Sequence, residues 1–311
     1  MGKTALLAAG GGGLSGAAVL AALAGSPLGV VLFYFAPLPL LLAGLGCGSN
    51  AFGFAAAAGL AVAVAFGGFA GAGLYGGMHV IPSWLIVQQA LRRRASSPDG
   101  WQPIGRVLAA LTLLIAFVVA STTWVGRGAL GIEEEVRQLL TAVGHVAAPG
   151  LGEADHRALA DRLTPLFLGF SAITWLVMMI VNTGLAQSLL AARGWNQRPR
   201  PRWSQLRLPG WFDWVLVGTA ATALVTGGDA TFLARNILMI LLTPYFFVGL
   251  TVTHVILRRA PMPRLALAAF YGILLVFFLV VGGIVAAIGV VEQWIGVRNR
   301  LAVAGPHGRS E

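Results

Sequence analysis

Charged side chains are scarce in this chain. Asp, Glu, Lys and Arg together make up 10% of its 311 residues, whereas hydrophobic residues make up 57%. Soluble domains carry about 25% charged residues, so this composition excludes a protein with an ordinary water-facing surface. A mean hydropathy of +0.81 agrees with that exclusion. The composition therefore predicts an integral membrane protein.

Cysteine and the common catalytic motifs are almost absent as well. The single cysteine, Cys47, excludes an intrachain disulfide and a metal site built from several thiolates. The five histidines are scattered, and neither His-Glu-x-x-His nor Gly-x-Ser-x-Gly occurs. Residues 71–76 match Gly-x-Gly-x-x-Gly, but they join two apolar runs, whereas a dinucleotide fingerprint follows a strand. The sequence thus predicts no metal and no cofactor.

Acidic residues are missing from the middle of every long apolar run. Asp213, Asp229 and Glu292 all lie near the end of a run. Carboxylate proton relays place acids within the span, and hydrolases with paired acids need two such groups close together. These absences predict that the chain is not an enzyme.

What the chain does contain is a series of apolar runs of about 20 residues, the length that crosses a bilayer. We expect an all-α fold, a polytopic transmembrane helical bundle of about eight or nine helices. The predicted segments are 4–24, 27–46, 51–71, 74–91, 105–126, 165–191, 211–226, 231–257 and 265–291. They are predicted to form one integral membrane domain over 1–300, with a four-helix half at 4–91 and the remaining helices at 105–291. Residues 301–311 are predicted to be a disordered tail.

Positive charge gathers in three of the connections between these runs. Arginines cluster at 92–94, 193–207 and 258–264, and nine segments place all three connections on one side. Basic connections stay in the cytoplasm, so we expect these connections and the N-terminus to be cytoplasmic, in agreement with Lys3. Topology and lipid headgroups explain the net charge of +10, so the lipid bilayer is the expected partner and nucleic acid is not.

Both ends of the chain leave alternatives open. The run 4–24 is similar to a secretory signal, but it is about twice as long as an ordinary apolar signal region, so we interpret it as a retained helix. The tail carries arginines at 298, 300 and 309, yet nine crossings place it outside. Either the last segment does not fully cross, or the count is off by one.

The acidic connection 127–162 is predicted to lie outside and to contain amphipathic helices. Its apolar residues recur at helical spacing from Ile132 to Val143, and Pro149-Gly150 ends the pattern. A second short helix is expected to start near Glu153 and to run into the next segment. The ordinary interpretation is a hairpin on the membrane face, and the more specific one is a lid over an outward-facing cavity.

Polar side chains inside apolar runs are the strongest functional pointers, because their burial in a membrane is costly. Each one alone is more often an interhelical hydrogen-bonding residue than a ligand contact. Arg235 is the only fixed charge well inside a run, and it either snorkels, pairs with Asp229 or contacts an anionic solute. Asn236 and His254 are five helical turns apart and share one face. The predicted substrate-binding residues are Tyr34, His79, Asn182, Arg235, Asn236 and His254.

Prolines interrupt three of the runs. A proline frees a backbone carbonyl, which a neighbouring helix or a lined cavity must satisfy, and broken segments are pointers to transporter binding sites. Helix packing is the alternative explanation. The predicted kink positions are Pro37, Pro39, Pro82 and Pro244.

Small residues recur every four positions on two of the runs. They stand at Gly13, Ala17 and Ala21 in the first run, and again within 55–63. Such rows let helices approach closely. Contact within the protein is the ordinary interpretation, and contact between the first row and another membrane subunit is the alternative.

Several stretches, taken in order, resemble a known family. They are Leu-Phe-Tyr-Phe-Ala-Pro-Leu-Pro at 32–39, Trp-Gln-Pro-Ile-Gly-Arg at 101–106, the run 182–187 with the basic Arg-Pro loop, 245–250 with His254, and 292–298. Together they resemble the YybS-like family of predicted bacterial multi-pass membrane proteins (domain of unknown function 2232). The N-terminal half is also distantly similar to the substrate-binding subunits of energy-coupling-factor transporters. The resemblance implies an inner-membrane protein and supplies no catalytic residues.

Two functions from different classes remain. The first is a transporter-like or solute-binding membrane subunit that binds a small molecule, of unknown identity, among the proline-broken helices. The second is a non-catalytic membrane scaffold or assembly factor that acts through the basic cytoplasmic loops and the small-residue helix faces. An intramembrane enzyme agrees least with the sequence, because no acid–base or metal set is visible.

Overall fold

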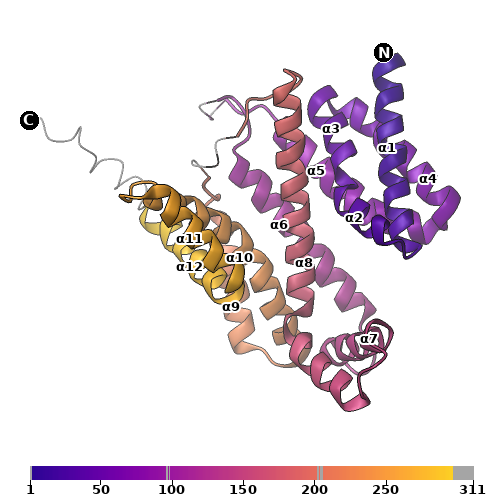
Figure 1. Ribbon diagram of the computed structural model, residues 1–311, viewed down its shortest axis with the longest axis vertical. Helices are drawn as coiled ribbons and strands as arrows, with labels where there is room; N and C mark the ends of the chain where they lie inside the picture. The colour runs from indigo at the N-terminus through magenta and orange to yellow at the C-terminus, as the bar shows by residue number, and fades with distance from the viewer. Residues whose placement is uncertain (1, 96, 98, 202, 204–205, 297–311) are drawn as a thin grey trace, which may run out of the picture. The chain divides into compact units, whose positions relative to one another are not determined.

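A computed structural model describes residues 2–95, 97, 99–201, 203 and 206–296 (Figure 1). Over these residues the chain consists of α-helices, one π-helical turn and connections, without a strand. Seven helical stretches in the described part are long and apolar enough to cross a membrane, and two shorter apolar helices accompany them. The predicted all-α transmembrane bundle is therefore confirmed.

The helices follow one another with mostly short connections. The first half of the chain holds α1 (Gly2–Leu23), α2 (Pro27–Phe35), α3 (Pro37–Cys47), α4 (Ser49–Tyr75), the π-helical turn η1 (Gly76–Val80), α5 (Ile81–Ala90) and α6 (Ile104–Gly126). The second half holds α7 (Ile132–Ala147), α8 (Glu153–Ala192), α9 (Trp211–Val225), α10 (Gly228–Leu257), α11 (Pro263–Val276) and α12 (Phe278–Ile295).

The chain forms two compact units. Unit 1 comprises residues 1–111 and 174–201, and unit 2 comprises residues 112–173 and 202–311. Helices α6 and α8 each contribute to both units, so neither unit is one continuous piece of sequence. The single membrane domain predicted over 1–300 stays a prediction.

In unit 1 the longest apolar stretch, Ser49–Ala90, turns back on itself at Gly68. Gly68 has a φ of 64°, which glycine adopts without a steric penalty. The two arms lie side by side, since a Cβ built on Gly76 would be 3.6 Å from the side chain of Leu60. The third and fourth predicted segments are therefore the two arms of one helical hairpin.

Helix α1 packs against the first arm of α4 through glycines. A Cβ on Gly12 would meet the backbone of Ala55, and a Cβ on Gly16 would meet the backbone of Gly59. Only residues without a side chain allow the two backbones to approach so closely. Close contact within the protein, the ordinary interpretation of the row at 55–63, therefore holds.

The row predicted on α1, at Gly13, Ala17 and Ala21, is one position further along the chain than the contact at Gly12 and Gly16. Ala17 is exposed, and Gly13 and Ala21 are half-buried. Their contact with another membrane subunit stays a prediction.

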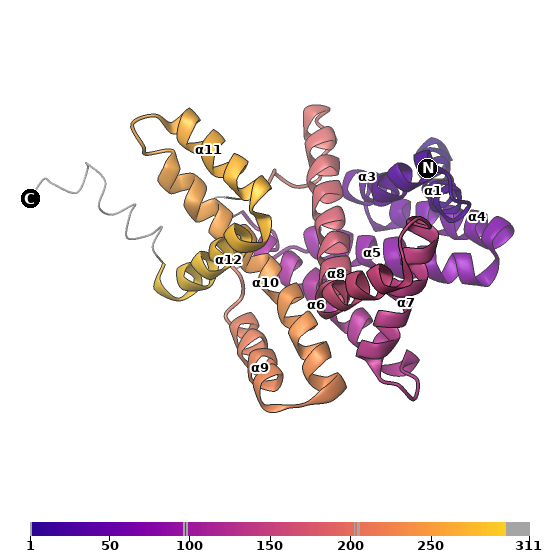
Figure 2. The ribbon, with the colours of Figure 1, turned by 60° about the horizontal axis from the view of Figure 1, so that its bottom comes forward.

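In unit 2 the last predicted segment, 265–291, is not one helix, so that prediction is wrong. Phe277, with φ −112° and ψ 39°, separates α11 from α12, and Figure 2 shows the two helices meeting at an angle. The 14 residues of α11 reach about 21 Å, which is short of the roughly 30 Å hydrocarbon core. Neither proline nor glycine marks the break, so the apolar run contained no sign of it.

Helix α12 meets α10 at two glycines. A Cβ on Gly249 would meet the backbone of Val285, and a Cβ on Gly289 would meet the backbone of Tyr245. This contact resembles that between α1 and α4, because in both cases glycine lets one helix lie directly on the backbone of another.

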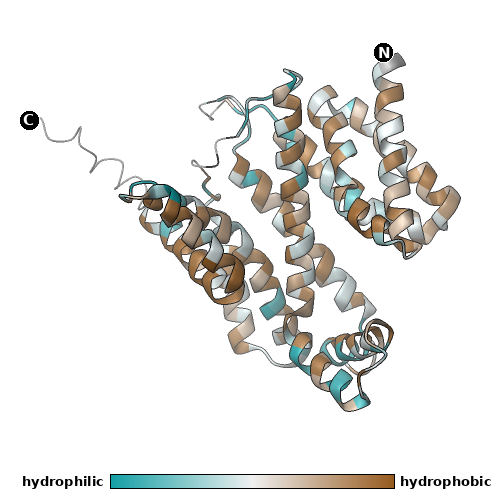
Figure 3. Ribbon diagram, in the orientation of Figure 1, coloured by the Kyte–Doolittle hydropathy of each residue, from teal (hydrophilic) through white to brown (hydrophobic). Residues whose placement is uncertain are grey.

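The acidic connection 127–162 contains α7 and the first turns of α8. Helix α7 starts at Ile132, and α8 starts at Glu153 and continues through the sixth predicted segment to Ala192. Figure 3 shows polar residues gathered on α7 and on the first turns of α8, whereas most other helices are largely apolar. Leu139 and Val143 of α7 are exposed.

Some predicted features fall outside the described residues. They are Arg202 of the basic loop, the arginines at 298, 300 and 309, and the tail at 301–311.

Candidate functional site

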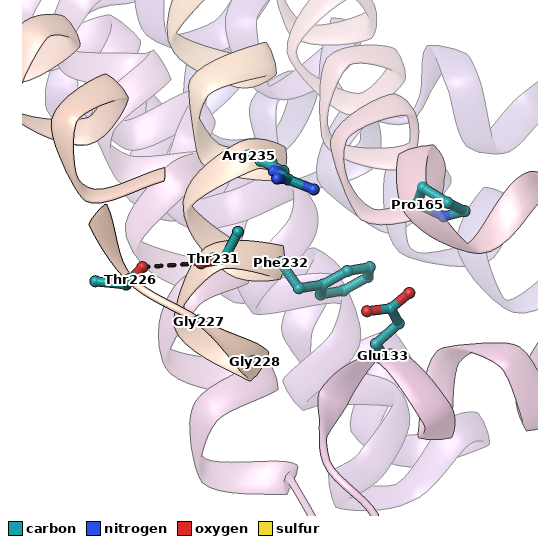
Figure 4. Close-up of a pocket in the computed structure, with 8 residues that line it drawn as sticks. All are labelled: Glu133, Pro165, Thr226, Gly227, Gly228, Thr231, Phe232 and Arg235. Atoms are coloured by element: carbon teal, nitrogen blue, oxygen red, sulfur yellow. Dashed lines mark hydrogen bonds between the residues drawn. The ribbon is translucent and has the colours of Figure 1, made fainter. Parts of the chain in front are cut away.

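A cavity in unit 2 contains the fixed charge that the sequence placed inside an apolar run (Figure 4). Its volume is about 320 Å³. Arg235 of α10 and Glu133 of α7 bring opposite charges to its wall. The lining residues are Glu133, Pro165, Thr226, Gly227, Gly228, Thr231, Phe232 and Arg235.

The turn between α9 and α10 forms one side of this cavity. Gly228, with a φ of 56°, opens α10 directly after the turn. The hydroxyls of Thr226 and Thr231 lie 3.0 Å apart and hydrogen-bond across it. Among the described residues no side chain caps the start of α10, so the first N–H groups of that helix, at its positive dipole end, are available beside the cavity.

Helix α7 is anchored next to the same turn. The backbone N–H of Ile132 donates a hydrogen bond to the Asp229 carboxylate at 2.8 Å, so a side chain of α10 caps α7. Ile132 and Val136 pack on Phe232 in a buried apolar cluster. This docking holds Glu133 at the cavity wall, and the choice between a lid and a hairpin on the membrane face stays a prediction.

Arg235 has no ion pair among the described residues, and its side chain is exposed. Asp229, which the sequence offered as a partner, is engaged with α7 instead. Glu133 pairs with Arg137, at 3.9 Å. A guanidinium with free donors in a cavity wall is suited to a carboxylate or a phosphate, which it can bind with two parallel hydrogen bonds.

Asn236, the neighbour of Arg235, is fully buried and ties α10 to α8. Its Oδ1 accepts from the Gly169 N–H at 2.8 Å, and its Nδ2 donates to the Pro165 carbonyl at 3.2 Å and to the Phe232 carbonyl at 2.9 Å. Gly169 and Pro165 are four residues apart in α8, the spacing at which an N–H and a carbonyl pair within a helix. The Asn236 amide binds both of these backbone groups. These contacts favour a structural role for Asn236.

A second polar group lies in unit 1, at the break between α2 and α3. Helix α2 ends at Phe35, and α3 begins at Pro37, one of the predicted kink positions. The Asn182 amide donates to the Tyr34 carbonyl at 2.7 Å, and the Ser15 hydroxyl donates to the Ala36 carbonyl at 2.5 Å. Side chains of α8 and α1 thus satisfy carbonyls beside the broken segment.

His79 belongs to the same unit and is completely buried in η1. Neither of its ring nitrogens has a partner among the described residues. Its ring contacts Phe33 edge-on, with centroids 4.7 Å apart, and lies 5.9 Å from the ring of Tyr75. Ser83, one turn further along the helix, is buried, and its hydroxyl also lacks a partner within the described part of the chain. Single π-helical turns occur frequently at functional sites, so His79 and Ser83 form a second candidate group.

One comparison with known proteins produced a match. The model of a family described as predicted membrane protein (DUF2232) matches residues 15–292. The chain belongs to this family. No curated protein and no solved structure matched the chain. The membrane location of this DUF2232 protein follows from the family and from its apolar helices. The narrower likenesses, to YybS and to energy-coupling-factor subunits, stay predictions.

The six predicted binding residues of the DUF2232 protein divide between its two units. Tyr34, His79 and Asn182 lie in unit 1, whereas Arg235, Asn236 and His254 lie in unit 2. Among them, Arg235 lines the cavity of Figure 4.

Two of the predicted binding residues, Tyr34 and His254, are not buried in a binding site. The Tyr34 side chain is exposed, and its link to Asn182 runs through its backbone. His254 Nδ1 lies 3.2 Å from the hydroxyl of Tyr271, so this pair joins α10 to α11.

The predicted proline kinks differ in outcome. Pro37 and Pro82 lie in the first turns of α3 and α5, where a missing N–H is tolerated. Pro39, the third residue of α3, also lies in a first turn, whereas Pro244 lies inside α10, which continues to Leu257.

The basic loop of the DUF2232 protein is partly built into unit 1. Arg198 is buried and donates to the carbonyl of Ala90 at 3.0 Å, and Arg200 donates to the carbonyl of Ser188 at 3.0 Å. Arg198 thus binds the last carbonyl of α5, where positive charge is favoured, and Arg200 binds a carbonyl near the end of α8. Burial lowers the pKa of Arg198 below its ordinary value, and the charge of Asp99 opposes that shift.

Sequence reasoning missed most of the cavity wall. Thr231 and Arg235 are four residues apart, so they share a helix face, and Thr226 precedes a Gly-Gly turn signal. Both patterns could have been recognised in the sequence. The contribution of Glu133 could not, because it depends on how α7 docks. Among the described residues, no three His, Cys, Asp or Glu side chains lie together as a metal site requires.

Proposed function

We propose that this DUF2232 protein is a transporter-like, solute-binding membrane subunit whose cavity around Arg235 takes a small anionic or zwitterionic solute. The observation that carries the proposal is Arg235 itself. It is a cation without an ion pair in the described part of the chain, and it lines a cavity of about 320 Å³ inside a protein otherwise poor in charge. The proposal assigns no catalytic step to the chain.

The cavity wall supplies the contacts that such a solute needs. The guanidinium of Arg235 binds a carboxylate or phosphate group, and the free N–H groups at the start of α10 add donors for the same charge. Glu133 offers an acceptor for an amino group. Pro165 and Phe232 contribute apolar surface for the apolar part of such a solute.

We also propose an orientation in a bacterial inner membrane, with the N-terminus in the cytoplasm. Two contacts support it. The Asp229–Ile132 bond places the connection before α7 on the same side as the α9–α10 turn. Gln197 donates to the Gly46 carbonyl at 3.1 Å, which places the basic loop beside the end of α3. The predicted topology through α10 requires both pairings, and in that topology the Arg235 cavity opens outward.

The proposal is tested by thermal unfolding of the purified chain with a panel of small anionic, zwitterionic, cationic and neutral solutes. A solute at about one hundred times its Kd raises the free energy of unfolding by about 2.7 kcal/mol. We expect an anionic or zwitterionic solute to produce such a stabilisation. Arg235→Gln should abolish it, whereas Arg162→Gln, which removes another exposed arginine of unit 2, should preserve it.

Two outcomes would contradict the proposal. One is a panel in which no charged solute stabilises the wild-type chain. The other is equal stabilisation of wild type and Arg235→Gln. Either result would favour the non-catalytic scaffold.

A further inference from the structure

A second cavity, in unit 1, differs from the first in composition. Its volume is about 590 Å³, and it lies between the first turns of α1, the last turns of α3 and the end of α8. Leu7, Leu42 and Leu190 belong to an otherwise largely apolar wall. Arg193 and Trp195 stand where α8 ends. The cavity is therefore an apolar groove with a cationic and aromatic end.

The groove runs from the ends of α1 and α3 along these helices. Thr4 and Cys47 mark the end of the groove nearest the helix termini, because they lie at the start of α1 and at the end of α3. Gly11 and Pro39 lie deeper, where a Cβ on Gly11 would be 3.5 Å from Cβ of Pro39. Seven residues of α1 separate Thr4 from Gly11, a depth of about 10 Å.

The charge of Arg193 is left for an external partner. Arg198 and Arg200 of the same loop bind helix carbonyls, but Arg193 has no ion pair among the described residues, and its guanidinium lies 5.9 Å from the ring of Trp195. None of the described residues that line the groove is acidic. Its electrostatics therefore complement an anion.

We propose that this groove binds an anionic phospholipid, with one acyl chain along the apolar wall and the phosphate at Arg193 and Trp195. Apolar surface at this depth contacts lipid chains, and tryptophan and arginine are typical of the headgroup level. Juxtamembrane arginines attract anionic headgroups. The site is independent of the Arg235 cavity, so either proposal can fail without the other.

Cys47 provides a native probe, because it is the single cysteine of the chain, is exposed and lines the groove. The experiment measures alkylation of Cys47 by a small maleimide in the detergent-purified full chain. Phosphatidylglycerol, phosphatidylcholine with the same acyl chains, and glycerol phosphate are added separately. We expect phosphatidylglycerol to protect Cys47 at concentrations about fivefold lower than phosphatidylcholine does, a preference of the size that one arginine near the headgroup gives. Glycerol phosphate should not protect it.

Two variants locate the preference. Arg193→Gln should make the two lipids equivalent, whereas Arg92→Gln, which removes an exposed arginine outside the groove, should keep the difference. Equal protection by the two lipids in the wild type, or loss of the preference in Arg92→Gln as well, overturns the proposal. Protection by glycerol phosphate alone would identify an anion site without a lipid, and protection only at raised protein concentration would identify a second copy of the chain. Both results would also overturn it.

Discussion

Replacing Gly289 by alanine is expected to lower the free energy of unfolding by about 2 kcal/mol or more, the range for overpacking a tight contact. The added methyl group would meet the backbone of Tyr245, which cannot move away as a flexible side chain could. Helices α10 and α12 would have to separate, and the neighbouring contact of Gly249 with Val285 would be lost with them.

The matched control is Gly283→Ala in the same helix. Gly283 is exposed, and a Cβ there meets nothing within 4 Å. Because alanine is a better helix former than glycine by about 1 kcal/mol, this variant should be unchanged or more stable. Unfolding of both variants by denaturant or heat gives the comparison. Equal effects at the two positions would mean that the close contact between α10 and α12 is absent.

Replacing Asn236 by leucine is expected to lower the free energy of unfolding by about 2 to 3 kcal/mol. The substitution removes two hydrogen bonds to α8 and one within α10, and it leaves buried backbone groups without partners. The Gly169 N–H and the Pro165 carbonyl would then face an apolar side chain. Leucine is similar in size, so the loss would report the hydrogen bonds rather than a void.

Gln138→Leu is the control for this substitution, because Gln138 is an exposed amide on α7 whose side chain bonds only within its own helix. Its effect should stay within about 0.5 kcal/mol, as at most surface positions. If Asn236→Leu proved as mild as this control, Asn236 would not be a structural link between α8 and α10.

The sequence was sufficient to place most of the spans, because the bilayer demands long apolar runs and allows few alternatives to a helix. It also contained the turn at Gly68, in a run of small residues. The break at Phe277 was not predictable, since no proline or glycine accompanies it. Tertiary packing alone decides where such an apolar run bends.

Helix faces were harder to predict than helix positions. In a soluble protein the buried face is the apolar one, but in a membrane both the lipid-facing and the buried residues are apolar. The row at Gly13, Ala17 and Ala21 and the true contact row at Gly12 and Gly16 therefore look alike in the sequence. Which of the two rows makes the contact depends on how the partner helix packs, and the sequence does not indicate that packing.

The candidate site was predictable only through its rarest residue. Arg235 stood out because charge is costly within a span, and the structure places it in a cavity wall. Its neighbour Asn236 satisfied the same criterion but holds two helices together. Glu133 enters the wall from a helix about a hundred residues earlier, through the Asp229 cap, and no local pattern indicates that contact.

The most direct measurement is the accessibility of a cysteine placed in the Arg235 cavity. Thr226→Cys in a Cys47→Ser background puts one thiol at an exposed position of the cavity wall. We predict that a membrane-impermeant maleimide labels it in intact cells, and that the anionic or zwitterionic solute which stabilises the purified protein slows this labelling. Labelling that requires opened membranes, or a rate that no such solute changes, would contradict an outward-facing binding cavity.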